Sequence, residues 1–170
     1  MTRQYTLSKS ITYASVASVL CTLLHSSPVY LPVAGMLLSP ISTLPILLVT
    51  MLNPLSGIFT WVCTTTMLFF LSPQEAAIFF CTTGCLGLVL GFVYRAGFFR
   101  AIVLAAGALF AGILVLIYLF GIAAFGSIGQ IRIEVFLPAV LVFSFLYSLL
   151  WALILKHLAF RIIKIIERNH

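Results

Sequence analysis

The residues that could do chemistry are few in this sequence, and most lie far apart. Cys81 and Cys85 are four residues apart, so a helix would place both thiols on one face as a possible metal or redox pair. No histidine or acidic residue stands beside them, which favours the simpler interpretation of two small apolar fillers. The chain has no HExxH, GxSxG or phosphate-binding glycine motif. We therefore expect no enzyme, no metal site and no cofactor.

Two ionisable residues, His25 and Glu75, border apolar stretches of the chain. His25 lies near the outer end of the first predicted span, where a histidine at the membrane interface is the simplest interpretation. Glu75 begins a later stretch, where its carboxylate would favour the positive end of a helix dipole. A proton-coupled or ion-coupled carrier usually needs a buried carboxylate, and the sequence alone does not indicate one. We therefore expect a passive binding protein or a subunit.

Polar side chains that could meet a small molecule gather in three predicted loops and in the helices beside them. Together they could line a lidded pocket of mixed polarity on one side of the membrane. Taken singly, each is equally a solvated loop residue or an interfacial aromatic. The candidate substrate-binding residues are Tyr30, Gln74, Glu75, Tyr118, Gln130, Arg132, Glu134 and Tyr147.

The composition requires a bilayer around these residues. The chain of 170 residues is 63% hydrophobic and 7% charged, whereas a soluble domain carries about a quarter charged residues. A soluble core of this length could not hide so much apolar surface. We expect an all-α integral membrane protein with a single transmembrane domain, 1–170, and no cleaved signal peptide.

Apolar stretches of about 20 residues predict membrane-spanning helices. We expect a compact bundle of six such helices, followed by a basic tail over 156–170. The tail could lie at the membrane surface as an amphipathic segment or simply end the last span. The predicted spans are 10–27, 31–52, 55–72, 76–94, 100–122 and 135–155.

The basic residues predict the orientation of the bundle. Six spans with both termini in the cytoplasm place eight of the nine Lys and Arg residues inside and only Arg132 outside. The net charge of +6 is therefore a topology signal and an attraction to anionic lipid, not a sign of nucleic-acid binding. The expected location is a bacterial cytoplasmic membrane.

Two prolines, Pro40 and Pro45, interrupt the second predicted span. Each removes a backbone donor and strains the preceding turn, so we expect a kinked helix. Carbonyls freed in lipid need neighbouring partners or a cavity, and the hydroxyls of Ser39, Ser42 and Thr43 stand close by. The broken middle of this span could border a pocket or be a plain proline kink.

The layout resembles the S components of energy-coupling-factor transporters and is nearest to the YybS-like group of membrane proteins. The resemblance rests on GMLLSPISTLPILLVTMLNPLSGIFTWVCTTTMLFFL, followed after a short loop by TTGCLGLVLGFVYRAGF. A proline-rich second span leads directly into a third, and a glycine-rich fourth span ends at a basic turn. In local pattern the likeness covers only the middle third of the chain.

The resemblance implies a substrate-capture subunit that takes a vitamin or small metabolite from the outer side. Its implied partners are a T-type transmembrane subunit and two ABC ATPases. In these families an AxxxA-type motif in the first span forms the docking face. Here that face would comprise Ser10, Ala14 and Ser18, with serine replacing the second alanine.

Two other functions remain open on the sequence. A scaffold or assembly protein of the bacterial envelope would need protein partners and no ligand. A small autonomous channel or permease would need a polar stripe along a span, for which the best candidates are Thr64–Thr66 with Thr82 and Thr83. These threonines can equally bond carbonyls of their own helix.

Overall fold

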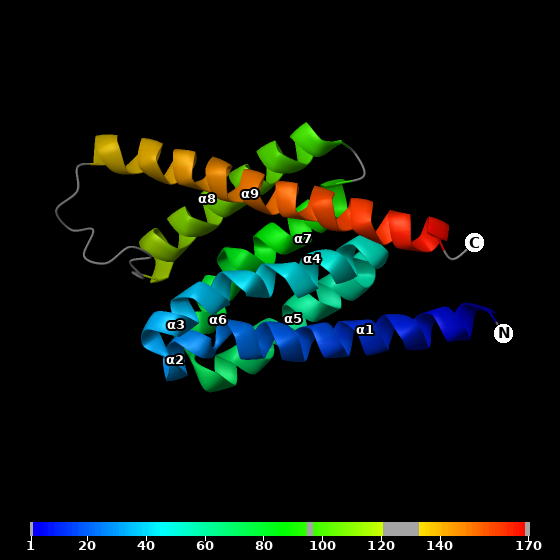
Figure 1. Cartoon of the computed structure of the whole chain (residues 1–170). Helices are drawn as coiled ribbons and strands as arrows, with labels where there is room; N and C mark the ends of the chain where they lie inside the picture. The colour runs from blue at the N-terminus through cyan, green and yellow to red at the C-terminus, as the bar shows by residue number, and fades with distance from the viewer. Residues whose placement is uncertain (1, 95–96, 121–132, 169–170) are drawn as a thin grey trace.

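The computed structural model describes residues 2–94, 97–120 and 133–168, and within these ranges the chain forms helices and no strand (Figure 1). In chain order the elements are α1 (Thr2–His25), α2 (Ser27–Tyr30), α3 (Pro32–Leu38), the 3-10 turn η1 (Ser39–Ser42), α4 (Thr43–Leu52), α5 (Pro54–Leu71), α6 (Pro73–Cys81), α7 (Thr83–Val93), α8 (Phe98–Phe120) and α9 (Ile133–Arg168).

Five helical stretches are long and apolar enough to cross a membrane, which confirms the predicted helical membrane class. They correspond to the second to sixth predicted spans: Pro32–Leu52, Pro54–Leu71, Pro73–Val93, Phe98–Tyr118 and Glu134–His157. Most of the first predicted span, 10–27, lies in α1. This helix has 24 residues, enough to cross a membrane, but it is richer in polar side chains and is not among the five.

The surface of the bundle is apolar. Large hydrophobic side chains are exposed on nearly every helix, and Val33 and Phe70 each keep 83% of their surface exposed. A monomeric soluble protein rarely leaves such extensive apolar surface in water. A bilayer accommodates it, so the burial pattern agrees with the composition.

Short polar caps start the helices at the turns. Asn53 Oδ1 accepts a hydrogen bond from Leu55 N (3.1 Å) at the start of α5, and Ser72 Oγ accepts one from Glu75 N (3.4 Å) at the start of α6. A proline follows each cap, where its missing N–H and fixed φ suit the first helical position.

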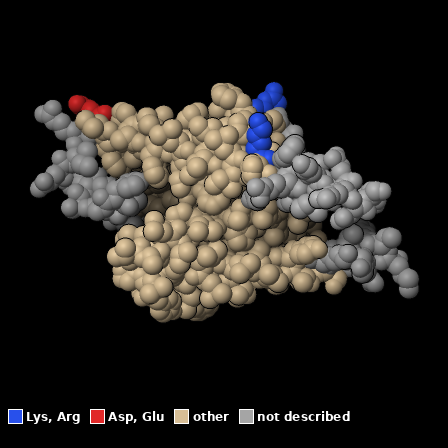
Figure 2. Space-filling model, viewed as in Figure 1, with Lys and Arg blue, Asp and Glu red and all other residues tan. Residues whose placement is uncertain are grey.

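The two chain ends lie at one end of the bundle, and α2, α3 and α6 lie near the opposite end (Figure 1). The described charges divide in the same way. Figure 2 shows the described basic side chains toward the end that holds the termini and an acidic side chain at the other. Lys156 Nζ lies 5.5 Å above the ring of Phe98, which joins the start of α8 to the later part of α9.

The interior has two apolar clusters that share α4. The larger joins α4, α7, α8 and α9, and the smaller joins α1, α4, α5 and α6. Glycines let α7 approach α4 closely, because a Cβ at Gly87 would lie 2.9 Å from the Thr43 carbonyl oxygen. A glycine likewise lets α8 approach α6 closely, because a Cβ at Gly112 would collide with the carbonyl of Cys81.

The structure corrects three details of the predicted layout. The first loop contains a helical turn, α2, since Pro28 suits the first positions of a helix. The fourth predicted span is two helices divided at Thr82. The predicted tail continues α9 without a break to Arg168, because no proline or glycine ends the helix there. Most of the predicted fifth loop, including Gln130 and Arg132, lies outside the described residues.

Candidate functional site

A fully buried histidine lies where α1 ends. His25 has 0% of its surface exposed, and hydroxyl groups from two other parts of the chain surround its Nδ1 atom. Ser39 Oγ lies 3.0 Å from Nδ1, Ser42 Oγ 3.2 Å and Thr83 Oγ1 3.5 Å. A polar group removed from water is stable only when it is hydrogen-bonded, so these hydroxyls compensate the burial of the ring.

The contacts around Nδ1 are compatible with two tautomers of the ring. The Ser42 hydroxyl donates to the Ser39 carbonyl (2.7 Å), so it can accept from a protonated Nδ1 but does not donate to the ring. Ser39 Oγ can donate to an unprotonated Nδ1 or accept from a protonated one. The other ring nitrogen, Nε2, faces Glu75.

Glu75 is the acidic partner of His25. Its Oε2 lies 3.6 Å from His25 Nε2, and its side chain is only 16% exposed. Nε2 makes no hydrogen bond with any described residue, so the pair is close without being joined. Phe79, one turn further along α6, places its ring edge-on against the imidazole with centroids 5.1 Å apart. Hydroxyl groups therefore surround one nitrogen of the ring, while Phe79 covers part of the ring with apolar surface.

Two helix breaks position the groups around His25. The first is η1, where Pro40 and the nearby Pro45 remove backbone donors and the chain tightens into a 3-10 turn. Cys21 of α1 donates its thiol to the Ser42 carbonyl (3.2 Å) and so satisfies one acceptor of this turn. The turn thereby presents its serine hydroxyls to α1.

The second break lies at Thr82, between α6 and α7. Its backbone angles, φ −116° and ψ −92°, depart from helical values. Both its amide and its hydroxyl bond the Ile78 carbonyl, at 2.9 and 2.6 Å. The following residue, Thr83, directs its hydroxyl toward His25. The 3-10 turn of the second span and the distorted turn at Thr82 thus meet around one buried histidine.

The structure brings together only some of the predicted substrate-binding residues. Glu75 joins His25, and Tyr147 is partly buried between α4 and α9. Four others are exposed: Gln74, Tyr30, Tyr118 and Glu134, with Tyr30 at 67% and Tyr118 at 65%. A common pocket that they line is not among the described cavities. Gln130 and Arg132 lie outside the described residues.

The predicted docking face on α1 is in contact with α5. Ala14 and Ser18 keep 8% and 3% of their surface exposed. The Thr60 hydroxyl donates to the Ala14 carbonyl (3.4 Å), and the Thr64 hydroxyl donates to the Ser18 carbonyl (3.4 Å). Ser10 accepts a hydrogen bond from Asn53 Nδ2 (3.0 Å). A partner could reach this face only if α1 and α5 separated, so docking there stays a prediction.

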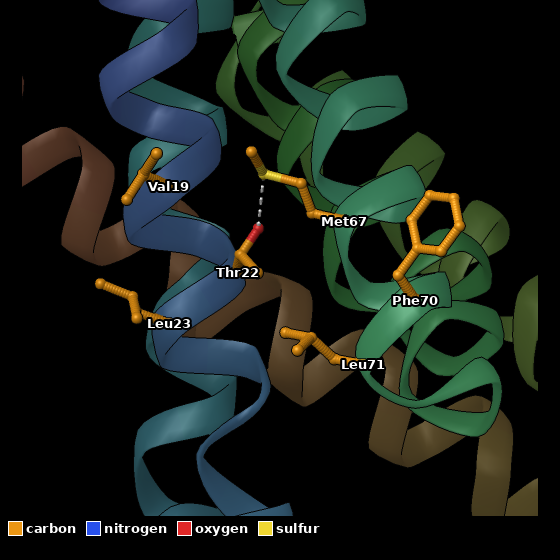
Figure 3. A pocket seen from close by; sticks show the side chains of 6 residues that line it. All are labelled: Val19, Thr22, Leu23, Met67, Phe70 and Leu71. Carbon is orange, nitrogen blue, oxygen red and sulfur yellow. Dashed lines mark hydrogen bonds between the residues drawn. The ribbon is translucent and has the colours of Figure 1, made fainter.

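An apolar groove of about 380 Å³ opens between α1 and α5 (Figure 3). Val19, Thr22 and Leu23 line one side, and Met67, Phe70 and Leu71 line the other. The only polar group among them is the Thr22 hydroxyl, which bonds its own helix at Ser18 O (2.8 Å) and contacts Met67 Sδ (3.5 Å). The groove is lined almost wholly by apolar side chains and offers no chemistry of its own.

A second cavity, of about 400 Å³, lies at the turn between α4 and α5. Ser10 and Tyr13 of α1 border it together with Asn53 and Ser56. Among the described residues, no three His, Cys, Asp or Glu side chains come together to hold a metal ion. Neither cavity therefore competes with the His25 cluster as the chemically distinctive site.

Sequence reasoning missed the His25–Glu75 pair. The two residues are 50 positions apart, and neither belongs to a recognised motif. The sequence alone did not indicate a buried carboxylate, whereas the structure leaves the Glu75 side chain only 16% exposed beside His25. One feature of the sequence did point toward this site. Ser39 and Ser42 flank Pro40, and this pattern predicted hydroxyl groups beside an interrupted helix.

No family model, curated protein or solved structure matches the chain.

Proposed function

We propose that this chain is a membrane-embedded substrate-capture subunit of an energy-coupling-factor type importer. In this proposal it binds a vitamin or small metabolite at the end of the bundle opposite the chain termini. Coupling to a T-type subunit and two ABC ATPases is the part that rests on the family resemblance alone.

The observation that carries the proposal is the buried His25 cluster between two helix breaks. Ionisable residues inside a membrane bundle are costly and are usually functional. His25 Nε2 makes no hydrogen bond with a described residue, and Glu75 Oε2 lies 3.6 Å from it. A ligand with both a donor and an acceptor group could form hydrogen bonds with both His25 and Glu75.

The location of the cluster also supports capture from one side of the membrane. His25 and Glu75 lie at the turns at the α2, α3 and α6 end, whereas the basic chain ends lie at the other end (Figure 1). With the basic ends in the cytoplasm, the site faces outward. His25 is closed to solvent here, so capture requires these turns to open.

Small-molecule extraction from the purified protein tests the binding role. The full chain is purified in mild detergent, and its bound metabolites are identified by mass spectrometry. We expect a small molecule from the native chain that is lost in His25→Phe and Glu75→Gln. Glu134→Gln is the matched control, because that carboxylate is exposed at the same end of the bundle. Equal release from all four proteins would contradict the proposed site.

Copurification from the native membrane tests the coupling role. We expect a T-type membrane subunit and ABC ATPases to accompany the tagged chain. Recovery with cell-wall machinery alone would favour the scaffold function and would count against the importer.

The buried His–Glu pair also favours a second candidate, a small proton-linked carrier that works alone. Such a carrier needs a titratable pair inside the membrane, and this pair lies 3.6 Å apart. Reconstitution of the chain alone in liposomes distinguishes the two functions. Uptake of the extracted ligand that depends on a pH gradient and is abolished by Glu75→Gln would establish the carrier. Binding of the ligand without uptake would favour the importer-subunit function over the autonomous carrier.

A further inference from the structure

The cavity at the turn between α4 and α5 is the more polar of the two described cavities. Its volume of about 400 Å³ falls within the range of about 300–1,000 Å³ that is typical of small-molecule sites. Four of its seven lining residues carry a hydroxyl or amide group: Ser10, Tyr13, Asn53 and Ser56. The cavity therefore offers several hydrogen bonds to a ligand.

Asn53 connects the two sides of this cavity. Its Nδ2 donates to Ser10 Oγ of α1 (3.0 Å), and its Oδ1 accepts from Leu55 N (3.1 Å). An asparagine amide has two hydrogens, so one N–H of Nδ2 remains available. Ser10 Oγ accepts from Asn53, and among the described residues its own hydrogen is donated to no other group. The contact thus brings two available donors together.

Ser56 supplies a third donor, although only 4% of its surface is exposed. Several hydroxyls of α1 and α5 donate to the carbonyl four residues earlier, as Thr60 does to Ser56 O (2.9 Å). Ser56 is the third residue of α5, so no carbonyl of that helix lies one turn before it. Its hydroxyl makes no hydrogen bond with a described residue. A buried hydroxyl that lines a cavity is stabilised when a ligand accepts from it.

The start of α5 favours a negatively charged oxygen at this position. Ser56 lies in the first turn of this 18-residue helix, where the N–H groups carry a partial positive charge. The lining contains no carboxylate, which a bound cation would need. A phosphate group has several oxygens that accept hydrogen bonds, so it matches the donors of this lining.

The surroundings of the cavity suit a phosphate that belongs to a lipid. The turn between α4 and α5 lies toward the end of the bundle that holds the chain termini, where the described basic side chains also lie (Figures 1 and 2). The rest of the lining is apolar, and Leu52 keeps 69% of its surface exposed. A phospholipid could place its phosphate on the donors and an acyl chain against Leu52. A soluble phosphate compound shares only the first of these contacts.

We propose that the cavity lined by Ser10, Tyr13, Asn53 and Ser56 binds the phosphate group of a ligand. A phospholipid head group and a soluble phosphate compound are the two sources of that group. The site shares no residue with the His25 cluster and lies toward the other end of the bundle. It therefore goes beyond the proposed capture function and does not depend on it.

Three probes test the site on the full chain in mild detergent: phosphatidylglycerol, diacylglycerol with the same acyl chains, and inorganic phosphate. Native mass spectrometry measures binding of the two lipids, and titration calorimetry measures binding of inorganic phosphate. We expect phosphatidylglycerol to bind about tenfold more tightly than diacylglycerol, because hydrogen bonds to a charged group are the stronger ones.

Two variants locate the binding in this cavity. Ser56→Ala and Tyr13→Phe each remove one hydroxyl from the lining, and we expect each to weaken phosphatidylglycerol binding by about tenfold. Tyr13 is exposed, so Tyr13→Phe keeps the packing of α1 even if Ser56→Ala does not fold. Ser15→Ala is the matched control, because this exposed serine of α1 donates to Ile11 O (2.9 Å) and does not line the cavity.

The pattern of binding identifies the source of the phosphate. Binding of phosphatidylglycerol alone, weakened by the site variants, identifies a lipid. Binding of inorganic phosphate that the same variants weaken identifies a soluble phosphate compound.

Two results would overturn the proposal. One is equal binding of phosphatidylglycerol and diacylglycerol with no binding of inorganic phosphate. The other is equal binding by Tyr13→Phe and the Ser15→Ala control. The release of metabolites that tests the His25 site is measured separately, so failure of either proposal leaves the other standing.

Discussion

His25 illustrates how a single side chain can acquire a role that its position in the sequence does not reveal. It lies at the end of a helix, where an interfacial histidine would be unremarkable, yet it is fully buried among three hydroxyls and a carboxylate. The burial arises because two distant helix breaks close over the end of α1. The polar surroundings of His25 therefore arise from tertiary contacts and not from its neighbours in the sequence.

At this scale we predict that His25 and Glu75 are energetically coupled. His25→Gln, Glu75→Gln and the double variant form a cycle, read as free energies of unfolding from denaturant titration in detergent. Since both single changes disrupt the same contact, we expect a coupling of about 0.5–3 kcal/mol. The cycle of His25→Gln with Glu134→Gln is the control and should be additive within about 0.5 kcal/mol. Additivity in the first cycle would show that the pair does not interact.

Sequence reasoning identified the types of residue at the site better than their arrangement. Ser39 and Ser42 were expected to supply hydroxyls beside the proline break, and they do so. The partner of those hydroxyls, His25, was not foreseen, because only the packing of α1 against η1 brings them together. Tyr30 and Tyr118 were expected at a pocket, and both are exposed. An aromatic in a membrane segment carries the same sequence signal whether it lines a pocket or faces lipid.

At the scale of the element, apolar length and turn residues set most of the layout. Proline after asparagine or serine starts α5 and α6, and apolar stretches of sufficient length give the second to sixth spans. The division of the fourth span at Thr82 was not predicted, because neither proline nor glycine occupies that position. There the hydroxyl competes with the backbone for the Ile78 carbonyl, a local choice that hydrophobic patterning does not record.

Two glycines of α8 provide a matched test of helix packing. A Cβ at Gly112 would collide with the Cys81 carbonyl, whereas a Cβ at Gly107 meets nothing within 4 Å. We expect Gly112→Ala to lower the free energy of unfolding by about 1–3 kcal/mol, because backbone would have to move. Gly107→Ala should raise it by about 0.5–1 kcal/mol through better helix propensity. Thermal unfolding in detergent measures both, and equal effects would contradict the packing of α8 against α6.

For the whole molecule, the distribution of charge predicts the orientation. The ends of the chain lie together, with the described basic side chains toward that end of the bundle (Figures 1 and 2). By the positive-inside rule we predict that this end faces the cytoplasm. That orientation would place the His25 site toward the outer face, which is what capture of an external molecule requires.

Cysteine labelling in intact cells tests the orientation. Single cysteines at the exposed positions Tyr30 and Gln74 should react with a membrane-impermeant maleimide from outside. Cysteines at Arg100 and Lys156, also exposed, should react only after the cells are opened. The parent chain, with its own four cysteines replaced by serine, gives the background. The reverse labelling pattern would indicate the opposite orientation in the membrane and would assign the His25 site to the cytoplasmic face.

The hydroxyl contacts between α1 and α5 have a consequence for how the protein is made. α1 is the least apolar of the long helices. Its carbonyls at Ala14 and Ser18 accept hydrogen bonds from the Thr60 and Thr64 hydroxyls of α5, and the Ser18 hydroxyl donates to the Thr60 carbonyl (3.5 Å). During synthesis α1 emerges before α5, because Thr60 and Thr64 follow α2, α3 and α4 in the chain. We therefore expect α1 to lack its hydrogen-bonding neighbour until α5 has been made. Its final packing in the bundle should then be completed only when this later helix arrives.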